Sequence, residues 1–114
     1  MSKNGLIELT ICDTLPCLKL KTKGDLTDID GIKREFTIDD KPIVVQQTTY
    51  PNKIFILQKI RFTDTGIEEL RLGYYIIGKK PGMRGRWVWG QYCPFIPQSD
   101  FKKLVNEAQK RGWL

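Results

Sequence analysis

The sequence predicts an α+β domain in which a twisted antiparallel sheet of about five to seven strands packs against one C-terminal helix. Three observations predict this class: apolar and polar residues alternate along most of the chain, turn residues separate the alternating stretches, and the apolar spacing becomes helical after Pro97. The chain has 114 residues, which suits one domain, and we expect 1–114 to form it.

The N-terminal part, residues 1–50, is expected to supply the first strands. Apolar and β-branched residues predict strands over 6–11, 18–21, 33–38 and 42–49. The last two are expected to form a hairpin across Asp39, Asp40 and Lys41. The acid-rich stretch 24–31 is expected to be a solvated loop.

Residues 53–92 carry a stronger strand pattern. Strands are predicted over 54–62, 68–77 and 86–92, with a turn at 63–66 and a glycine-containing loop at 78–85. Because strand side chains alternate between faces, Leu72, Tyr74 and Ile76 share one face, which we assign to the core. Arg71 and Tyr75 then face outward.

The final element is a helix expected over 97–112. An apolar stripe is formed by Phe101, Leu104, Val105 and Ala108, whose spacing is that of one helical face. Ser99 is a candidate N-cap and Gly112 a natural C-terminal stop. Trp113 and Leu114 are expected to fold back onto the apolar face.

Composition excludes several kinds of chemistry. The chain contains no histidine, so Ser–His and Cys–His nucleophile pairs and histidine metal ligands are ruled out. The spacing of Cys12, Cys17 and Cys93 matches no zinc motif, although the three thiols with Asp13 form an alternative zinc ligand set. We expect reduced thiols, no metal and no other cofactor.

No apolar run is long enough for a membrane helix and no signal peptide is recognisable, so a cytoplasmic location is expected.

Positive charge is concentrated in the second half of the chain. The net charge is +6; residues 1–50 carry seven basic and eight acidic groups, whereas residues 51–114 carry twelve basic and five acidic groups. Between residues 71 and 92 there is no acid, and the cations alternate with tyrosines and tryptophans. This combination is typical of single-stranded nucleic-acid binding, because cations neutralise phosphates while rings stack on unpaired bases.

The candidate site residues follow from this pattern. The cations expected to contact phosphate are Arg71, Lys79, Lys80, Arg84 and Arg86. The rings expected to stack on bases are Tyr75, Trp87, Trp89 and Tyr92. An alternative places Trp87 and Trp89 in the core beneath the helix, beside Phe101 and Trp113, because large aromatic side chains are often buried.

Short segments at 73–77, 80–85 and 96–101 resemble the transcriptional positive coactivator family of single-stranded-DNA binders and, more distantly, the Whirly proteins. The resemblance implies a curved antiparallel sheet, a helix that forms a homodimer, and DNA bound on basic, aromatic strands. Residues 87–92 and the first half of the chain have no counterpart in the family. The sequence therefore predicts a non-catalytic domain that binds single-stranded DNA or RNA.

Two alternatives remain. A protein-interaction module would use the same basic surface to bind an acidic partner. A small metal-dependent nuclease would use Asp39, Asp40 and Lys41 as an acid-x-Lys triplet, with Asp25, Asp28 or Asp30 as a further carboxylate. The nuclease requires these acids to converge on one metal ion.

Overall fold

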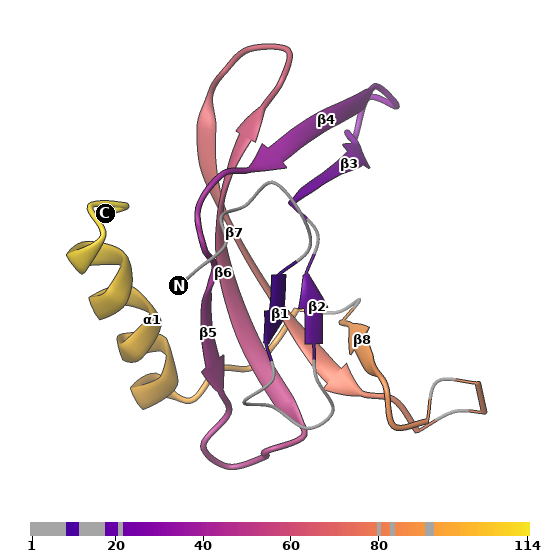
Figure 1. Ribbon diagram of the computed structural model, residues 1–114, viewed down its shortest axis with the longest axis vertical. Helices are drawn as coiled ribbons and strands as arrows, with labels where there is room; N and C mark the ends of the chain where they lie inside the picture. The colour runs from indigo at the N-terminus through magenta and orange to yellow at the C-terminus, as the bar shows by residue number, and fades with distance from the viewer. Residues whose placement is uncertain (1–8, 12–17, 21, 80, 83, 91–92) are drawn as a thin grey trace. The chain divides into compact units, whose positions relative to one another are not determined.

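An antiparallel sheet and a C-terminal helix are present in the computed structural model, which describes residues 9–11, 18–20, 22–79, 81–82, 84–90 and 93–114 (Figure 1). The predicted α+β class is confirmed. The larger sheet has six strands: β3 (Lys23–Thr27), β4 (Lys33–Ile38), β5 (Ile43–Gln46), β6 (Lys53–Phe62), β7 (Glu68–Ile77) and β8 (Trp87–Trp89). Strands β1 (Leu9–Ile11) and β2 (Leu18–Leu20) pair separately, and the helix α1 spans Gln98–Lys110.

The chain divides into two compact units. Unit 1 comprises residues 1–41 and 58–71, and unit 2 comprises residues 42–57 and 72–114. Strands β6 and β7 contribute residues to both. Each unit has its own cluster of buried apolar side chains.

Unit 1 contains a strand where the sequence predicts a loop. Residues 23–27 form β3, which pairs antiparallel with β4 and brings Gly24 opposite Phe36. Leu26 packs against the cluster of Phe36, Ile38, Ile60 and Phe62. The prediction of a solvated loop over 24–31 is therefore wrong for its first part. Residues 23–27 form a half-buried strand, in which only the alternate residues Gly24 and Leu26 are partly buried.

The predicted hairpin between 33–38 and 42–49 is also wrong. Strand β4 pairs with the C-terminal part of β6, with Ile38 opposite Ile60, whereas β5 pairs with the N-terminal part, with Ile43 opposite Leu57. Both strands therefore pair with β6 and not with each other. With ten residues, of which Ile54 to Gln58 are all buried, β6 is long and apolar enough to accommodate both.

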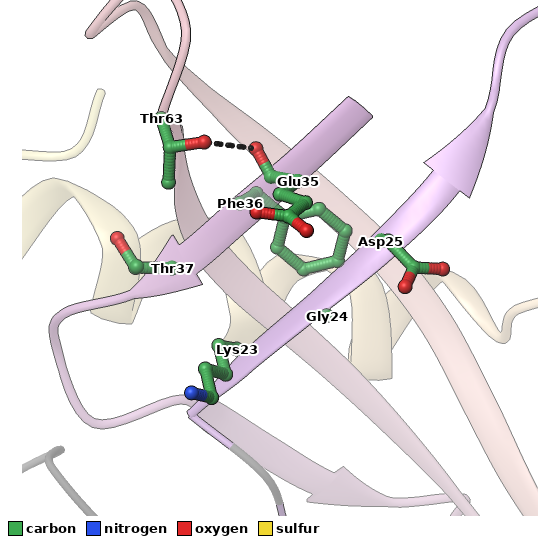
Figure 2. A pocket seen from close by; sticks show the side chains of 7 residues that line it. All are labelled: Lys23, Gly24, Asp25, Glu35, Phe36, Thr37 and Thr63. Atoms are coloured by element: carbon green, nitrogen blue, oxygen red, sulfur yellow. Dashed lines mark hydrogen bonds between the residues drawn. The ribbon is translucent and has the colours of Figure 1, made fainter. Parts of the chain in front are cut away.

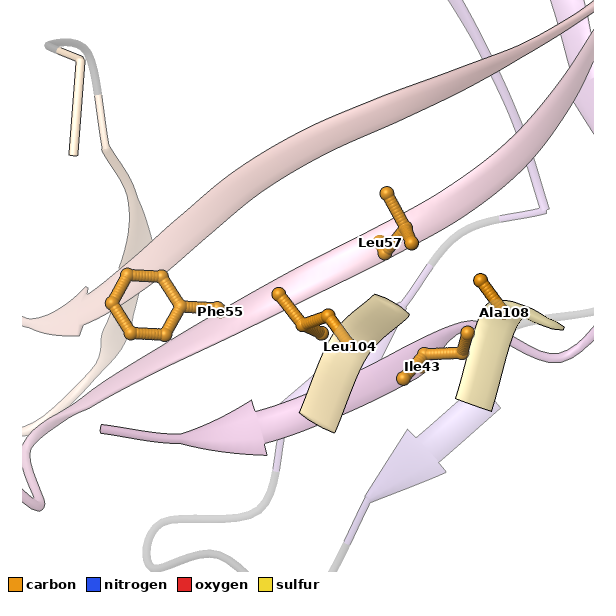
Figure 3. Close-up of a cluster of buried hydrophobic side chains, with 5 residues drawn as sticks. All are labelled: Ile43, Phe55, Leu57, Leu104 and Ala108. Atoms are coloured by element: carbon orange, nitrogen blue, oxygen red, sulfur yellow. The ribbon is translucent and has the colours of Figure 1, made fainter. Parts of the chain in front are cut away.

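Unit 2 is organised around α1. Its buried cluster joins Leu104 and Ala108 of the helix to Ile43, Phe55 and Leu57 of β5 and β6 (Figure 3). The predicted apolar stripe is confirmed for the two helix residues, and Val105 is half-buried. Phe101 departs from it, because 49% of its surface is exposed.

The two ends of α1 are held differently. Pro97 is the N-cap residue and no side chain caps the helix, so the prediction of Ser99 as cap is wrong. At the C-terminal end Gly112 has φ 78°, as the predicted glycine stop requires, and the backbone N–H of Trp113 donates to the carbonyl of Ala108 at 2.9 Å. Trp113 packs against the unit 2 cluster, whereas Leu114 is exposed.

A buried carboxylate joins the first turn of α1 to the segment that follows β5. Asp100 is completely buried and accepts hydrogen bonds from the backbone N–H and the hydroxyl of Thr48; Lys103 Nζ lies 4.0 Å away. Burial by itself would raise the pKa of Asp100. The two hydrogen bonds from Thr48 and the charge of Lys103 outweigh it, so the pKa lies below the ordinary aspartate value.

This pKa predicts a pH-dependent contribution to stability. Because the folded-state pKa is lower than the unfolded value of about 4, the contribution is complete above that unfolded value and is lost as the pH falls through the folded-state pKa. We expect Asp100→Asn to lower the free energy of unfolding by about 1–3 kcal/mol near neutral pH. The difference from the unchanged protein should shrink as the solution is acidified.

Urea unfolding followed by tryptophan fluorescence, from about pH 7 to about pH 3, measures this difference. Thr48→Val, which removes only the hydroxyl donor, should give a smaller loss in the same pH range. Asp30→Asn is the control, because Asp30 is exposed. Unchanged stability of Asp100→Asn at neutral pH would contradict the prediction.

Candidate nucleic-acid interface

Two adjacent tyrosines of β7 lie on opposite faces of the sheet. Tyr74 packs against the cluster beneath α1, and the ammonium group of Lys53 lies 5.0 Å from its ring centre. Successive side chains of a strand point to opposite faces, so Tyr75 lies on the face away from α1. The assignment of Tyr74 to the core side and of Tyr75 to the other side is confirmed. The assignment of Leu72 to the core is wrong, because 39% of its surface is exposed.

The register between β7 and β8 places both tryptophans on the same face as Tyr75. Tyr75 is opposite Trp89, and Ile77 is opposite Trp87. The rings of Tyr75 and Trp89 meet edge to face, with centroids 5.1 Å apart and an interplanar angle of 78°. The alternative in which these tryptophans lie beneath the helix is therefore wrong.

Gly73 provides the space in which Trp89 lies. A Cβ atom added at Gly73 would overlap the indole ring of Trp89, so no larger residue fits without moving the ring. Trp89 keeps 36% of its surface exposed in this position, and Trp87 is half-buried. Unit 2 thus presents an accessible aromatic surface, formed by Tyr75, Trp87 and Trp89, which we call the aromatic face.

The loop between β7 and β8 carries the candidate phosphate contacts. The backbone N–H of Gly78 donates to the carbonyl of Arg86 at 2.8 Å, which closes the loop at its base. Lys79, Arg84 and Arg86 are exposed and form no ion pair with any described residue. Because β8 begins directly after Arg86, the loop cations adjoin the strand that carries Trp87 and Trp89.

One of the predicted site residues, Arg71, is not part of this arrangement. Arg71 belongs to unit 1, where its Nε donates to Gln58 Oε1 at 2.8 Å and its guanidinium lies 4.9 Å from the centre of the Phe36 ring. We therefore do not count it among the candidate phosphate contacts. Lys80 and Tyr92 lie outside the described residues.

The charges of the two units differ strongly. Unit 1 contains ten basic and eleven acidic residues, whereas unit 2 contains nine basic and two acidic residues. Cations of unit 1 pair with acids of the same unit, as in Arg34–Asp64, Lys59–Glu68 and Arg61–Asp39. The excess positive charge of the protein therefore belongs to the unit that holds the aromatic face.

A hollow in unit 1 has Asp25, one of the acids of the nuclease alternative, in its lining. Its volume is about 400 Å³, and it is lined by Lys23, Gly24, Asp25, Glu35, Phe36, Thr37 and Thr63 (Figure 2). Asp25 pairs with Lys33 at 3.5 Å, and Asp39 pairs with Arg61. Nowhere in the described part of the chain do three Asp, Glu, Cys or His side chains gather around a position for a metal ion. The convergence that the nuclease alternative requires is thus not observed in these residues.

The alternative zinc set can be followed only at one position. Cys93 is exposed and is not part of a disulfide with a described residue. Cys12, Cys17 and Asp13 lie outside the described residues.

Comparisons with protein-family models, with curated proteins and with solved structures find no match. The resemblance to the coactivator and Whirly families consequently stays a prediction. No helix among the described residues is long and apolar enough to cross a membrane.

The packing of Trp89 over Gly73 makes a direct prediction. Gly73→Ala should displace the indole, break the edge-to-face contact with Tyr75, and destabilise the protein by about 1–3 kcal/mol through overpacking. The indole N–H resonances report this: that of Trp89 should shift while that of Trp113, which packs in the α1 cluster, stays in place. Gly90→Ala is the matched variant, because its added methyl group would instead overlap Tyr74 on the other face. Equal shifts of Trp89 in both variants would contradict the assignment of faces.

Proposed function

We propose that the protein binds nucleic acid, with single strands favoured over duplexes, through the aromatic face and the cations of the 78–86 loop, and that it carries out no chemistry of its own. One observation supports this proposal: exposed cations that form no ion pair with a described residue adjoin a strand whose tryptophans lie on the face opposite the helix.

The cations account for affinity. A phosphate backbone releases counterions when basic side chains neutralise it, and cations already paired with protein carboxylates contribute less to this release. Lys79, Arg84 and Arg86 have no described acidic partner, and unit 2 holds only two acids to compete for them. One of these two, Asp100, is buried and bonded to Thr48.

The aromatic face accounts for the preference for single strands. Each unpaired base exposes a π-face, and its stacking on an aromatic ring contributes about 1–3 kcal/mol regardless of sequence. Bases in a duplex are already stacked on each other and offer no such face except at the ends. Trp89 is the most exposed of the three rings and is held by its contacts with Gly73 and Tyr75.

The charge component predicts the salt dependence. Replacing Lys79, Arg84 and Arg86 together by Ala should weaken binding to oligo(dT) and to unrelated sequences alike, and should reduce the slope of log affinity against log salt by about two units. Fluorescence anisotropy between about 50 and 200 mM salt measures this slope. Alanine at Lys23, Lys102 and Lys110 removes the same charge from other exposed positions and is the control. An equal loss of slope in both variants would show attraction by net charge and no defined site.

The stacking component predicts selective loss of single-strand binding. Trp89→Leu should weaken oligo(dT) binding about tenfold, since stacking of one base is worth about 1–3 kcal/mol, and should change duplex binding much less. Oligo(dT) should also quench tryptophan fluorescence of the unchanged protein. An acidic protein partner would contact the cations and would not need the aromatic rings. A protein-interaction module would therefore be favoured if an acidic polypeptide competed with oligo(dT) and Trp89→Leu left the binding of both unchanged.

A further inference from the structure

Unit 1 exposes isoleucines at two turns where local structure does not require them. Ile29 and Ile32 lie in the turn between β3 and β4, with 106% and 60% of their surface exposed, and Ile67 lies in the turn between β6 and β7, with 55% exposed. Turns favour Gly, Asn, Asp, Pro and Ser, so isoleucine contributes nothing to forming them. Exposed in this way, the three side chains contribute little to the buried core of unit 1 either.

Both turns are held in defined conformations by hydrogen bonds. The backbone N–H of Asp28 donates to the carbonyl of Ile32 at 2.8 Å, and that of Phe62 donates to the carbonyl of Ile67 at 3.0 Å. Side chains also hold the backbone at two of the isoleucines. The carboxylate of Asp30 accepts a hydrogen bond from the N–H of Ile32, and the hydroxyl of Thr65 accepts one from the N–H of Ile67. Apolar side chains on such ordered turns lose little conformational entropy when they bind a partner.

One arginine brings the two turns together. The guanidinium of Arg34 lies 3.2 Å from Asp64 in one turn and 3.9 Å from Asp28 at the start of the other. It also stacks on the ring of Phe62, with 3.8 Å between its central carbon and the ring centroid, which ties it to the buried cluster. The exposed isoleucines of both turns therefore belong to one end of unit 1.

Acidic groups outnumber basic ones around these isoleucines, since the adjacent Lys33 is paired with Asp25. Asp28 and Asp64 share Arg34, and the carboxylate of Asp30 is bonded only to a backbone N–H among the described residues. This sign excludes phosphate-rich partners such as nucleic acid or an anionic membrane surface. It complements a surface that carries lysine or arginine.

We propose that the two turns of unit 1, with Ile29, Ile32 and Ile67 at their centre, form a docking surface for a protein segment that presents apolar residues flanked by basic ones. This surface belongs to unit 1, whereas the proposed nucleic-acid interface belongs to unit 2 and has the opposite charge. The two interactions are therefore separable by mutation.

Selection of short random peptides displayed on phage, against the full chain, tests the proposal. Counter-selection against the Ile29→Ser/Ile32→Ser/Ile67→Ser variant discards peptides that bind elsewhere, including acidic peptides on the basic loop. We expect the surviving peptides to contain Lys or Arg beside apolar residues, to bind the triple variant at least about tenfold more weakly, and to lose affinity as salt is raised. Oligo(dT) binding by the triple variant should be unchanged.

Controls separate docking from folding. The triple variant should keep the circular dichroism spectrum and thermal midpoint of the unchanged protein, since the three side chains are exposed. Phe95→Ser/Leu114→Ser, which removes exposed apolar residues from unit 2, should leave peptide binding intact. Should the triple variant fail to fold, Asp30→Asn, which retains the acceptor for the N–H of Ile32, should still weaken the binding of basic peptides severalfold.

Three results would overturn the proposal. The first is that no peptide binds the unchanged protein more tightly than the triple variant. The second is that the peptides that do so are acidic. The third is that sedimentation velocity shows a dimer of the unchanged protein and a monomer of the triple variant. The last result would assign the surface to a second copy of the chain.

Discussion

The candidate interface depends on the register between β7 and β8. Pairing of Tyr75 with Trp89 and of Ile77 with Trp87 fixes which side chains share a face. Tyr74, the residue before Tyr75, packs against the cluster beneath α1, so Tyr75 and the two tryptophans lie on the other side of the sheet. A shift of the pairing by one residue would exchange the two faces and place the tryptophans beneath the helix. Gly73 and Gly90 fit this register, since each leaves room for one ring, Trp89 on one face and Tyr74 on the other.

Charge is distributed between the units in a way that complements this arrangement. In unit 1 the cations balance acids, and Arg34 and Arg71 are held against aromatic rings and polar partners of the same unit. In unit 2 the acids are nearly absent, and Lys79, Arg84 and Arg86 form no ion pair with a described residue. The protein therefore presents a strongly basic unit and a nearly neutral one whose turns carry acidic and apolar residues.

The sequence predicted the fold class, β7, α1 and the opposite faces of Tyr74 and Tyr75, because these depend on periodicity within one segment. It was wrong to place Leu72 in the core, because 39% of its surface is exposed. It failed for β3, which lies in an acid-rich stretch that resembled a loop, and for β4, whose partner is β6 and not the next strand along the chain. Strand β5 pairs with β6, the strand that follows it, and not with β4. It could not decide whether Trp87 and Trp89 lie beneath the helix, because that depends on which face α1 covers. The exposed turn isoleucines were visible in the sequence, but their common location depends on the contacts of Arg34 with Asp28 and Asp64.

The most direct test of the proposed nucleic-acid interface is to locate the bound strand. Ultraviolet cross-linking of the full chain to a bromodeoxyuridine-substituted oligo(dT), followed by digestion and mass spectrometry, identifies the residues in contact with the bases. We expect cross-links at Tyr75, Trp87 or Trp89, with Trp89 the most frequent because it is the most exposed. Cross-links confined to unit 1, or their absence at low salt, would contradict it.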